Sequence, residues 1–281
     1  MEMAISRFGY VTLVGAPNIG KSTLLNQLIG MPISIVNKKS HTTRRQILGV
    51  FNHNASQVVM LDTPGYQELT RDYDYKLMRR EINAALDGSD LILYLIDLKT
   101  DLSIVEKVYR RLNEFSSNIF IIINKIDRIR DKSKLLDYSE KLSSLVDFKK
   151  VYFISALKND GLKDLKDTIA EYLPEGEAQF DKDYQTNLSL SERAQEEIRN
   201  AILNCLHEEV PYGIEIQINN IKKDQDLVIH ADLVTKKKSY KSMIIGKDAR
   251  TIKAIGTQAR KNIEKWCGTK CSLFLKVNHT K

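Results

Sequence analysis

Short apolar runs alternate with helical patterns through the first part of the chain. The runs are continuous and rich in β-branched residues, which is typical of strands buried on both faces of a parallel sheet. They span Tyr10–Val14, Val58–Leu61, Leu91–Ile96, Ile119–Ile123 and Val151–Ile154. Between them lie amphipathic stretches such as Leu24–Ile29 and Leu162–Ile169, with apolar residues at helical spacing. This alternation predicts an α/β fold, a doubly wound domain with a mostly parallel sheet.

The pattern changes after Leu173–Gly176, where a polar stretch with little apolar periodicity follows. We expect a linker over residues 179–190 that joins a domain over 1–178 to a smaller domain over 191–281. In the second part, the patterns predict the order α-β-β-α-α-β, which is typical of a compact α+β domain. The predicted elements are a helix at Glu192–Leu206, strands at Ile214–Ile218 and Leu227–Leu233, a basic loop at Lys236–Tyr240, helical stretches on both sides of Ile255–Gly256, and a strand at Ser272–Val277.

Charge is distributed unevenly in this chain of 281 residues, which has a formal net charge of +7. Residues 236–281 contain 13 Lys and Arg residues but only two acids, Asp248 and Glu264. Such an excess favours a phosphate-rich partner, although a solvated basic face would give the same composition. The three cysteines lack the spacing of a disulfide or zinc framework, and no apolar run approaches the ~20 residues of a membrane span. We therefore expect a soluble cytoplasmic protein without a secretory signal.

A phosphate-loop motif lies where the first predicted strand meets the first predicted helix. Its residues are Gly15, Ala16, Pro17, Asn18, Ile19, Gly20, Lys21, Ser22 and Thr23. The glycines allow backbone N–H groups to surround phosphates at a helix N-terminus, where the helix dipole also favours negative charge. In this pattern Lys21 reaches the β- and γ-phosphates and the Ser22 hydroxyl binds Mg²⁺. With the strand and helix in place, a chance glycine-rich turn is a poor alternative.

Three further motifs indicate which nucleotide is bound. They are Asp62-Thr63-Pro64-Gly65, then Asn124 and Lys125 with Asp127, and then Ser155-Ala156-Leu157, each at the end of a predicted strand. The Asp62 carboxylate can hold Mg²⁺ through water, and the Gly65 N–H can meet the γ-phosphate. The Asp127 carboxylate can accept hydrogen bonds from guanine N1–H and N2–H₂, a donor pair that adenine lacks. A backbone N–H of Ser155-Ala156 can meet guanine O6. Each motif is weak alone, but their order predicts guanine.

The segment Lys38–Arg45 contains two adjacent threonines before Asp62. A threonine in this loop can bind Mg²⁺ in the triphosphate state and release it after hydrolysis. We favour Thr43 over Thr42 for this role, and a surface hydroxyl is the alternative. The predicted metal ligands are therefore Ser22, Thr43 and Asp62.

The nucleotide motifs resemble those of the translation-factor-related class of GTPases. Many switch proteins carry a Gln after the Asp-x-x-Gly motif to orient the attacking water, but Tyr66 stands there in this chain. In related GTPases without that Gln, an Asn at the position of Asn18 helps to bind K⁺ against the phosphates. We hypothesise that Asn18 does so here, with a loop-stabilising hydrogen bond as the alternative, and we expect slow intrinsic hydrolysis. The candidate catalytic residues are Lys21, Thr43, Gly65 and Asn18.

The second domain has a glycine turn between predicted helices. The turn and the α-β-β-α-α-β order resemble a type II KH domain, in which a Gly-x-x-Gly turn clamps the nucleic-acid backbone. Ala249 stands where the second glycine of that turn belongs. The resemblance implies that RNA is bound by Gly246, Lys247, Asp248, Ala249, Arg250 and Lys253.

The whole chain, from Ile5 to Val277, resembles the Era family of ribosome-associated GTPases. Beyond the motifs above, the resemblance includes Asp183–Thr186, Val210–Tyr212 and Ile244–Gly256. It implies hydrolysis of GTP to GDP with Mg²⁺, binding near the 3′ end of small-subunit ribosomal RNA, and a role in assembly and maturation of the ribosomal small subunit. We expect a monomer, and leave peripheral association with the inner membrane open.

Two other functions are weighed against this one. In the first, the KH-like domain is degenerate and the protein is a GTPase adaptor that meets another protein or an anionic membrane surface. In the second, the chain is the GTPase component of an RNA-modifying enzyme, but it contains no redox or one-carbon motif. Competition by single-stranded ribosomal RNA against unrelated RNA separates RNA binding from the adaptor function better than salt dependence does, since both are electrostatic.

Overall fold

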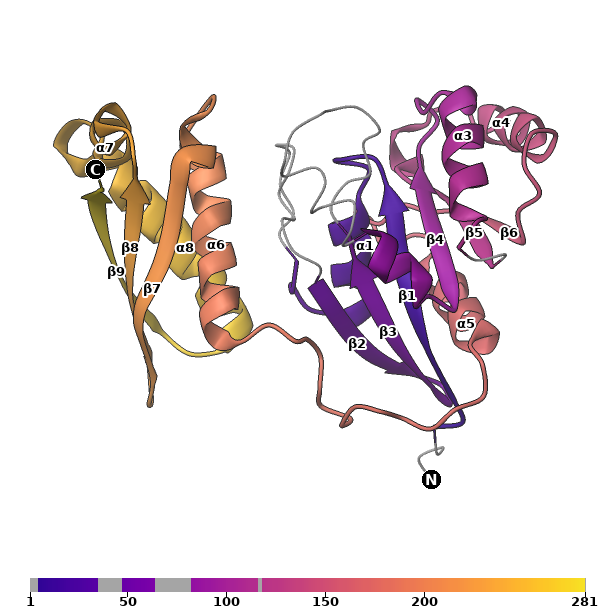
Figure 1. The fold of residues 1–281 in the computed structure, drawn as a ribbon, viewed down its shortest axis with the longest axis horizontal. Coiled ribbons are helices and arrows are strands. Elements are labelled where there is room, and N and C mark those ends of the chain that lie inside the picture. Colours follow the sequence, from indigo (N-terminus) through magenta and orange to yellow (C-terminus); the bar gives the residue numbers. More distant parts are fainter. Residues whose placement is uncertain (1–4, 35–46, 64–81, 116–117, 281) are drawn as a thin grey trace. The chain divides into compact units, whose positions relative to one another are not determined.

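The chain forms two compact units, Met1–Asn187 and Leu188–Lys281. The structure is a computed structural model, and it describes residues 5–34, 47–63, 82–115 and 118–280 (Figure 1). Each unit has its own sheet and its own hydrophobic core, so each is described separately.

The N-terminal unit contains a six-stranded sheet with the order β2-β3-β1-β4-β5-β6. β1 pairs in parallel with β3 and β4, and β4, β5 and β6 continue the parallel ladder, whereas β2 is antiparallel to β3. The five predicted runs all form strands, and the mostly parallel sheet is confirmed. β2 is an additional edge strand. The strands are β1 (Arg7–Gly15), β2 (Ile47–His53), β3 (Ser56–Asp62), β4 (Leu91–Ile96), β5 (Ile119–Ile123) and β6 (Lys150–Phe153).

Helices lie on both faces of this sheet. The helices are α1 (Lys21–Ile29), α3 (Leu102–Leu112), α4 (Ser133–Ser143) and α5 (Leu162–Tyr172). α3 and α4 share a core with Ile119 and Ile121 of β5. Phe120 lies between these two residues in the strand, so its side chain points to the opposite face, where its ring meets Tyr172 of α5. The two layers leave the carboxyl ends of the parallel strands as the edge at which loops meet, which is where ligands bind in such folds.

The stretch predicted as a linker has regular contacts with the N-terminal unit. The Gln57 side-chain oxygen in β3 accepts hydrogen bonds from the backbone N–H groups of Gln179 and Phe180, both at 2.9 Å. The Val50 N–H in β2 donates to the Gln185 carbonyl at 2.9 Å. This segment therefore continues along the outer edge of β2, which extends the N-terminal unit into the predicted linker as far as Asn187.

The C-terminal unit has the predicted order α-β-β-α-α-β, with helices packed on one three-stranded sheet (Figure 1). β7 and β8 are antiparallel, and β8 and β9 are parallel. α6 begins with a capping box between Ser189 and Glu192. The elements are α6 (Leu190–Cys205), β7 (Ile214–Lys223), β8 (Leu227–Thr235), α7 (Lys238–Ile245), α8 (Arg250–Cys267) and β9 (Cys271–His279).

Two local predictions in this unit were wrong. The predicted basic loop at Lys236–Tyr240 ends early, because α7 begins at Lys238. Ile255–Gly256 does not separate two helices but lies inside α8. A mid-helix glycine costs about 1 kcal/mol relative to alanine, and the fully buried residues Ile255, Ala259 and Ile263 hold the helix on the core through it. The two helices α7 and α8 are separated at Gly246 instead. In the described residues, no helix has both the length and the apolar character needed to span a bilayer.

Candidate nucleotide site and nucleic-acid interface

The nucleotide loop, Gly15–Ser22, connects β1 to α1 as predicted. Gly20 has φ 109°, a backbone conformation that favours glycine, and it precedes the first turn of α1. A methyl group at Gly20 would lie 2.3 Å from the Asn124 side-chain nitrogen. Asn18 also has a left-handed backbone, with φ 59°, and its side chain is exposed. The loop therefore approaches the end of β5 so closely that only glycine fits at Gly20.

Lys21 is buried at the beginning of α1, with 6% of its surface exposed. Its ammonium donates hydrogen bonds to the Gly15 carbonyl at 2.9 Å and the Ala16 carbonyl at 3.1 Å. Burial lowers the pKa of Lys21 from 10.5 to about 8, although the charge of Asp62 raises it. A buried cation whose partners among the described residues are two carbonyls and a nearby carboxylate is well suited to an anionic ligand such as a phosphate.

Asn124 joins three of the predicted motifs. Its side-chain nitrogen donates to the Ile19 carbonyl in the nucleotide loop at 2.9 Å. Its side-chain oxygen accepts from the N–H groups of Lys125 at 2.8 Å and Ala156 at 3.0 Å. Because Asn124 is 3% exposed, these bonds are sheltered from water. One side chain thus fixes the phosphate loop relative to both segments predicted to meet the base.

The Asp127 side chain is held by the last of these motifs. The Ser155 hydroxyl donates to one Asp127 carboxylate oxygen at 2.6 Å, and the Asp127 side chain itself is exposed. Lys125 has a left-handed backbone, and its ammonium forms an ion pair with Asp97 at 2.9 Å. Burial raises the pKa of Asp97, but the hydrogen bond and charge of Lys125 outweigh it and leave the pKa below its ordinary value. Leu157 is 64% exposed beside this region.

Asp62 lies fully buried at the end of β3. One carboxylate oxygen, Oδ2, accepts hydrogen bonds from the hydroxyls of Ser22 and Ser34, both at 2.8 Å. The other oxygen, Oδ1, is buried and has no hydrogen-bond partner among the residues that the structure describes. Burial raises the pKa of Asp62, and the charge of Lys21 with the two hydroxyls partly offsets this. Thr63 is anchored through its hydroxyl to the Leu13 carbonyl at 2.7 Å.

Several predicted site residues lie outside the described residues. They are Thr43, Pro64 and Gly65, together with Thr42, the alternative to Thr43. Tyr66, at the position of the usual Gln, lies outside the described residues too. The remaining nucleotide-site predictions fall at the carboxyl ends of β1, β3, β5 and β6, and the hydrogen bonds of Asn124 and Asp62 join them into one site. Pro17 lies in the nucleotide loop, and Thr23 lies in the first turn of α1.

The Gly246 loop, defined as Gly246–Arg250, forms the turn between α7 and α8. Gly246 has φ 72° and ψ 172°, a combination essentially restricted to glycine, and a methyl group there would lie 2.2 Å from the Thr251 hydroxyl. Asp248 and Ala249 follow with φ 53° and 58°. Ala249 therefore adopts the left-handed backbone that a glycine would favour, and the turn keeps this shape despite the extra methyl group.

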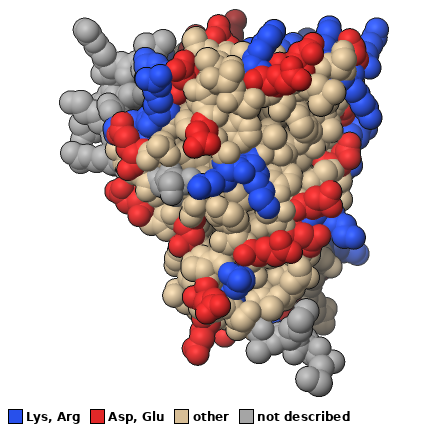
Figure 2. All heavy atoms as spheres, turned by 90° about the vertical axis from the view of Figure 1, so that its right-hand side faces the viewer, with Lys and Arg blue, Asp and Glu red and all other residues tan. Residues whose placement is uncertain are grey.

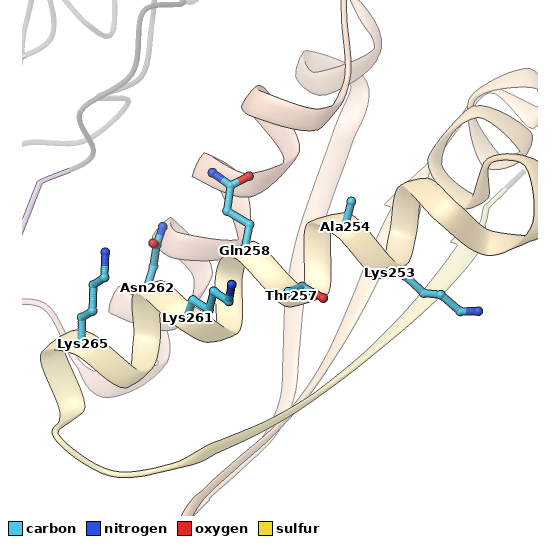
Figure 3. A pocket seen from close by; sticks show the side chains of 7 residues that line it. All are labelled: Lys253, Ala254, Thr257, Gln258, Lys261, Asn262 and Lys265. Carbon is cyan, nitrogen blue, oxygen red and sulfur yellow. The ribbon is translucent and has the colours of Figure 1, made fainter.

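The polar side chains of the Gly246 loop point to solvent. Lys247 is exposed, and Arg250 and Asp248 are 79% and 70% exposed with 3.9 Å between their charged atoms. Lys253 follows on α8, and Lys261 and Lys265 extend from the same helix around a shallow groove (Figure 3). By contrast, Figure 2 shows basic and acidic side chains interspersed on a face of the N-terminal unit.

Two family models match the chain in separate segments. One, described as a 50S ribosome-binding GTPase, covers residues 10–125, and one described as a KH domain covers residues 209–280. GTPase Era of Coxiella burnetii is 37% identical over 270 residues, which is 96% of this chain and 91% of that protein. GTPase Era of Ruminiclostridium cellulolyticum is 37% identical over 273 residues, with the same shares covered. The chain belongs to the GTPase Era family.

Solved structures of Era are similar to this chain over both units. The crystal structure of Era in complex with MgGDPNP and nucleotides 1506-1542 of 16S ribosomal RNA is 36% identical, has a TM-score of 0.90, and covers 98% of this chain and 94% of that one. A crystal structure of an Aquifex aeolicus Era variant bound to GDP·AlF4⁻ has the same identity, TM-score and coverage. The chain is accordingly a GTPase with a mostly parallel phosphate-loop domain and a C-terminal KH domain.

Sequence reasoning missed three residues of this Era-family nucleotide site: Asn26, Ser34 and Asp97. Asn26 interrupts the apolar pattern of Leu24–Ile29, and this polar residue in a core-facing helix is a signal that could have identified it. Ser34 and Asp97 lie outside every motif. Their contacts with Asp62 and Lys125 depend on how distant segments meet at the edge of the sheet, which local patterns do not report.

Proposed function

We propose that this chain is a GTP-hydrolysing molecular switch that binds small-subunit ribosomal RNA near its 3′ end and assists assembly of the small subunit. The observation that carries the proposal is the likeness, over both units at a TM-score of 0.90, to Era bound to MgGDPNP and a 16S ribosomal RNA fragment. Such a protein works in the cytoplasm, where ribosomes assemble, and we propose that it acts as a monomer. Peripheral association with the inner membrane is a separate hypothesis.

The proposed Mg²⁺ site fits the residues around Asp62. Ser22 and Asp62 would hold the ion together with Thr43, which lies outside the described residues. The buried Oδ1 of Asp62 lacks a hydrogen-bond donor among the described residues, and a metal-bound water would supply one. When bound, Mg²⁺ neutralises charge on the β- and γ-phosphates. The protein's own contribution is to keep Lys21 and the Asp62 carboxylate in place before the nucleotide arrives.

Guanine selection is proposed to rest on Asp127. The Ser155 hydroxyl occupies one of its carboxylate oxygens and restrains the side chain, so that the carboxylate is oriented before the base binds. Guanine offers this carboxylate two N–H donors, whereas adenine leaves it without either. The Ala156 N–H already donates to Asn124 and the Ser155 N–H to the Asp160 carbonyl, so either group would have to share its hydrogen with guanine O6.

Hydrolysis is proposed to use K⁺ held by Asn18, because Tyr66 replaces the usual water-orienting Gln. The exposed, left-handed Asn18 sits in the nucleotide loop, where its side chain remains available to a cation beside the phosphates. We expect faster GTP hydrolysis in potassium chloride than in sodium chloride at equal ionic strength, and loss of the difference in Asn18→Ala. Equal rates in the two salts would remove K⁺ from the mechanism.

RNA engagement is proposed to use the Gly246 loop and Lys253. The exposed Lys247 and Arg250 place positive charge beside a turn whose glycine admits a close backbone approach. Lys261 and Lys265 continue this charge along α8 (Figure 3). Phosphate contacts of this kind supply affinity and salt dependence, while bases supply selectivity.

The test is RNA binding by the full chain loaded with a GTP analogue. The probe is an oligonucleotide matching the 3′ end of small-subunit ribosomal RNA, and a scrambled oligonucleotide of equal length and composition is the control. Selective, tight binding that is weakened in the Lys247→Ala/Arg250→Ala double variant supports the proposal. Weak binding that does not distinguish the two oligonucleotides contradicts it, and would transfer the output of the GTPase to a protein or membrane partner.

A further inference from the structure

The two oxygens of the Asp62 carboxylate have different surroundings. Oδ2 accepts two hydroxyl hydrogen bonds, from Ser22 and Ser34, each at 2.8 Å. Oδ1 is equally buried and has no partner among the described residues. A carboxylate rotates about its Cβ–Cγ bond with a broad, roughly two-fold preference, so its two oxygens can exchange places unless neighbours fix one of them. The hydrogen bonds from the Ser22 and Ser34 hydroxyls fix Oδ2.

Ser34 differs from an ordinary loop serine because its backbone is also fixed. The Asn26 side-chain nitrogen donates to the Ser34 carbonyl at 2.8 Å, and the Asn26 side-chain oxygen accepts from the N–H groups of Ile33 and Ser34, both at 2.9 Å. Ser34 is 5% exposed. Three hydrogen bonds to one side chain therefore hold the Ser34 hydroxyl against Asp62.

Both hydroxyls that contact Asp62 depend on helix α1 for their position. Ser22 and Asn26 are four residues apart in α1, so they lie on one face of the helix, one turn from each other. Two residues of α1 therefore restrain the Asp62 carboxylate, Ser22 directly and Asn26 through Ser34. Asn26 and Ser34 belong to none of the predicted nucleotide motifs.

We propose that Ser34, held by Asn26, is a positioning residue for the magnesium site: it occupies Oδ2 of Asp62 and leaves Oδ1 as the acceptor for a metal-bound water. The inference rests on the proposed Mg²⁺ site. Residues that orient a metal ligand, or an acceptor of metal-bound water, typically contribute about 10- to 100-fold to metal affinity. Ser22 keeps one hydrogen bond to Oδ2 in the absence of Ser34, so we expect an effect at the lower end of that range.

The test measures release of fluorescently labelled GDP from the full chain across a magnesium titration. In the parent protein, release should slow as Mg²⁺ binds, and the midpoint then reports metal affinity. Ser34→Ala should raise that midpoint about tenfold while leaving the release rate in excess chelator unchanged. Asn26→Ala should shift the midpoint in the same direction, because Ser34 then loses both of its backbone hydrogen bonds to Asn26 and Ile33 loses the third. This variant also serves if Ser34→Ala does not fold.

A matched control is available in the strand that ends at Asp62. Ser56, at the beginning of β3, is 3% exposed and donates its hydroxyl to the Ala170 carbonyl at 2.9 Å. Ser56→Ala removes a buried serine hydroxyl of the same unit without touching Asp62, so its magnesium midpoint should match the parent's.

The outcomes separate this inference from the proposed function. An unchanged midpoint in Ser34→Ala, or an equal acceleration of release with and without Mg²⁺, overturns the positioning role. An equal shift in Ser56→Ala overturns it too, because the effect would then be general loss of stability. Release from the parent that does not depend on Mg²⁺ at all would overturn the proposed metal site together with the inference.

Discussion

The two loops predicted to meet phosphates are built in opposite ways. The nucleotide loop is packed against the sheet, with Lys21 6% exposed and Gly20 too close to Asn124 for any side chain. The Gly246 loop presents Lys247 and Arg250 to solvent, and Asp248, at 3.9 Å from Arg250, has most of its own surface exposed. A buried loop fixes charges before its ligand arrives and can therefore discriminate between small molecules. An exposed loop depends more on screened charge and tracks a polymer backbone.

Substitution of Asp127 should change the choice of base more than any other substitution considered changes its own property. Asp127→Asn replaces one of two acceptor oxygens with an amide donor. That donor would oppose the N–H donors of guanine, so one hydrogen bond to the base would be lost. We expect the preference for GTP over XTP to fall by about 10⁴-fold, because a buried or engaged polar group without a partner discriminates on this scale. Competition binding of labelled GDP against GTP and XTP measures it. A preference unchanged within threefold would show that Asp127 does not contact the base.

The second effect tests the tight packing of the nucleotide loop. Gly20→Ala would push the Asn124 amide from the Ile19 carbonyl, and we expect GDP affinity to fall about 100-fold, as a lost buried hydrogen bond of up to ~3 kcal/mol allows. The control is Gly30→Ala, since Gly30 also has a positive φ, of 85°, but open space around it. Calorimetric titration with GDP should separate the two variants. Equal affinities would mean that backbone strain, not the Asn124 contact, matters.

The exposed loop should respond in a graded way. Lys247→Ala and Arg250→Ala should each weaken RNA binding several-fold and reduce the slope of log affinity against log salt by about 0.7, the value for one single-strand phosphate contact. The matched control is Lys270→Ala, because Lys270 adjoins Leu227 at the beginning of β8, the end of the sheet away from α7. Binding titrations over a range of salt concentrations give the slopes. If the variants have the same slope as the parent, the RNA backbone does not contact Lys247 or Arg250.

A smaller effect concerns Glu197 of α6, a half-buried carboxylate in the C-terminal unit. Burial raises the pKa of Glu197 in α6, although its hydrogen bonds with Asn262 and Asn200 and the charges of Arg193 and Lys265 oppose this. The folded state therefore binds this proton more tightly than the unfolded chain does, and stability falls as pH rises from the ordinary value of 4.5 through the raised one. Glu197→Gln should be more stable than the parent at neutral pH, with the difference vanishing below the ordinary pKa. Urea unfolding at several pH values measures it, and a parent that is the more stable at neutral pH would contradict the assignment.

The smallest effect concerns Ala249. Its φ of 58° already provides the turn that a glycine would form. Ala249→Gly should therefore leave the shape of the turn unchanged and alter RNA affinity by less than about threefold. Gly246→Ala, at a position with no room for a methyl group, should weaken binding clearly. A large gain in Ala249→Gly would show that the methyl group obstructs RNA.

Much of the site could be predicted from sequence because its chemistry is local. The phosphate-loop residues and Asn124–Asp127 are contiguous, and each follows an apolar run that reads as a buried strand. The edge strand Ile47–His53 was missed because Gly49 and Asn52 interrupt its apolar pattern. Ile255–Gly256 was misread as a break because a glycine in a helix is a local signal, whereas the burial of Ile255 and Ala259 that overrides it is tertiary. Ser34 and Asp97 lay beyond prediction for the same reason, since their partners are distant in the chain.

If the buried nucleotide site controls the exposed Gly246 loop, the RNA affinity of the full chain must differ between its two nucleotide states. Fluorescence anisotropy of the 3′-end ribosomal oligonucleotide would be measured with a GTP analogue and with GDP. Coupling between sites is commonly worth about 5- to 150-fold in affinity, and we predict at least a fivefold tighter complex with the GTP analogue. Equal affinities in the two states would show that nucleotide binding and RNA binding are independent properties of two joined units, and that the protein is not a switch.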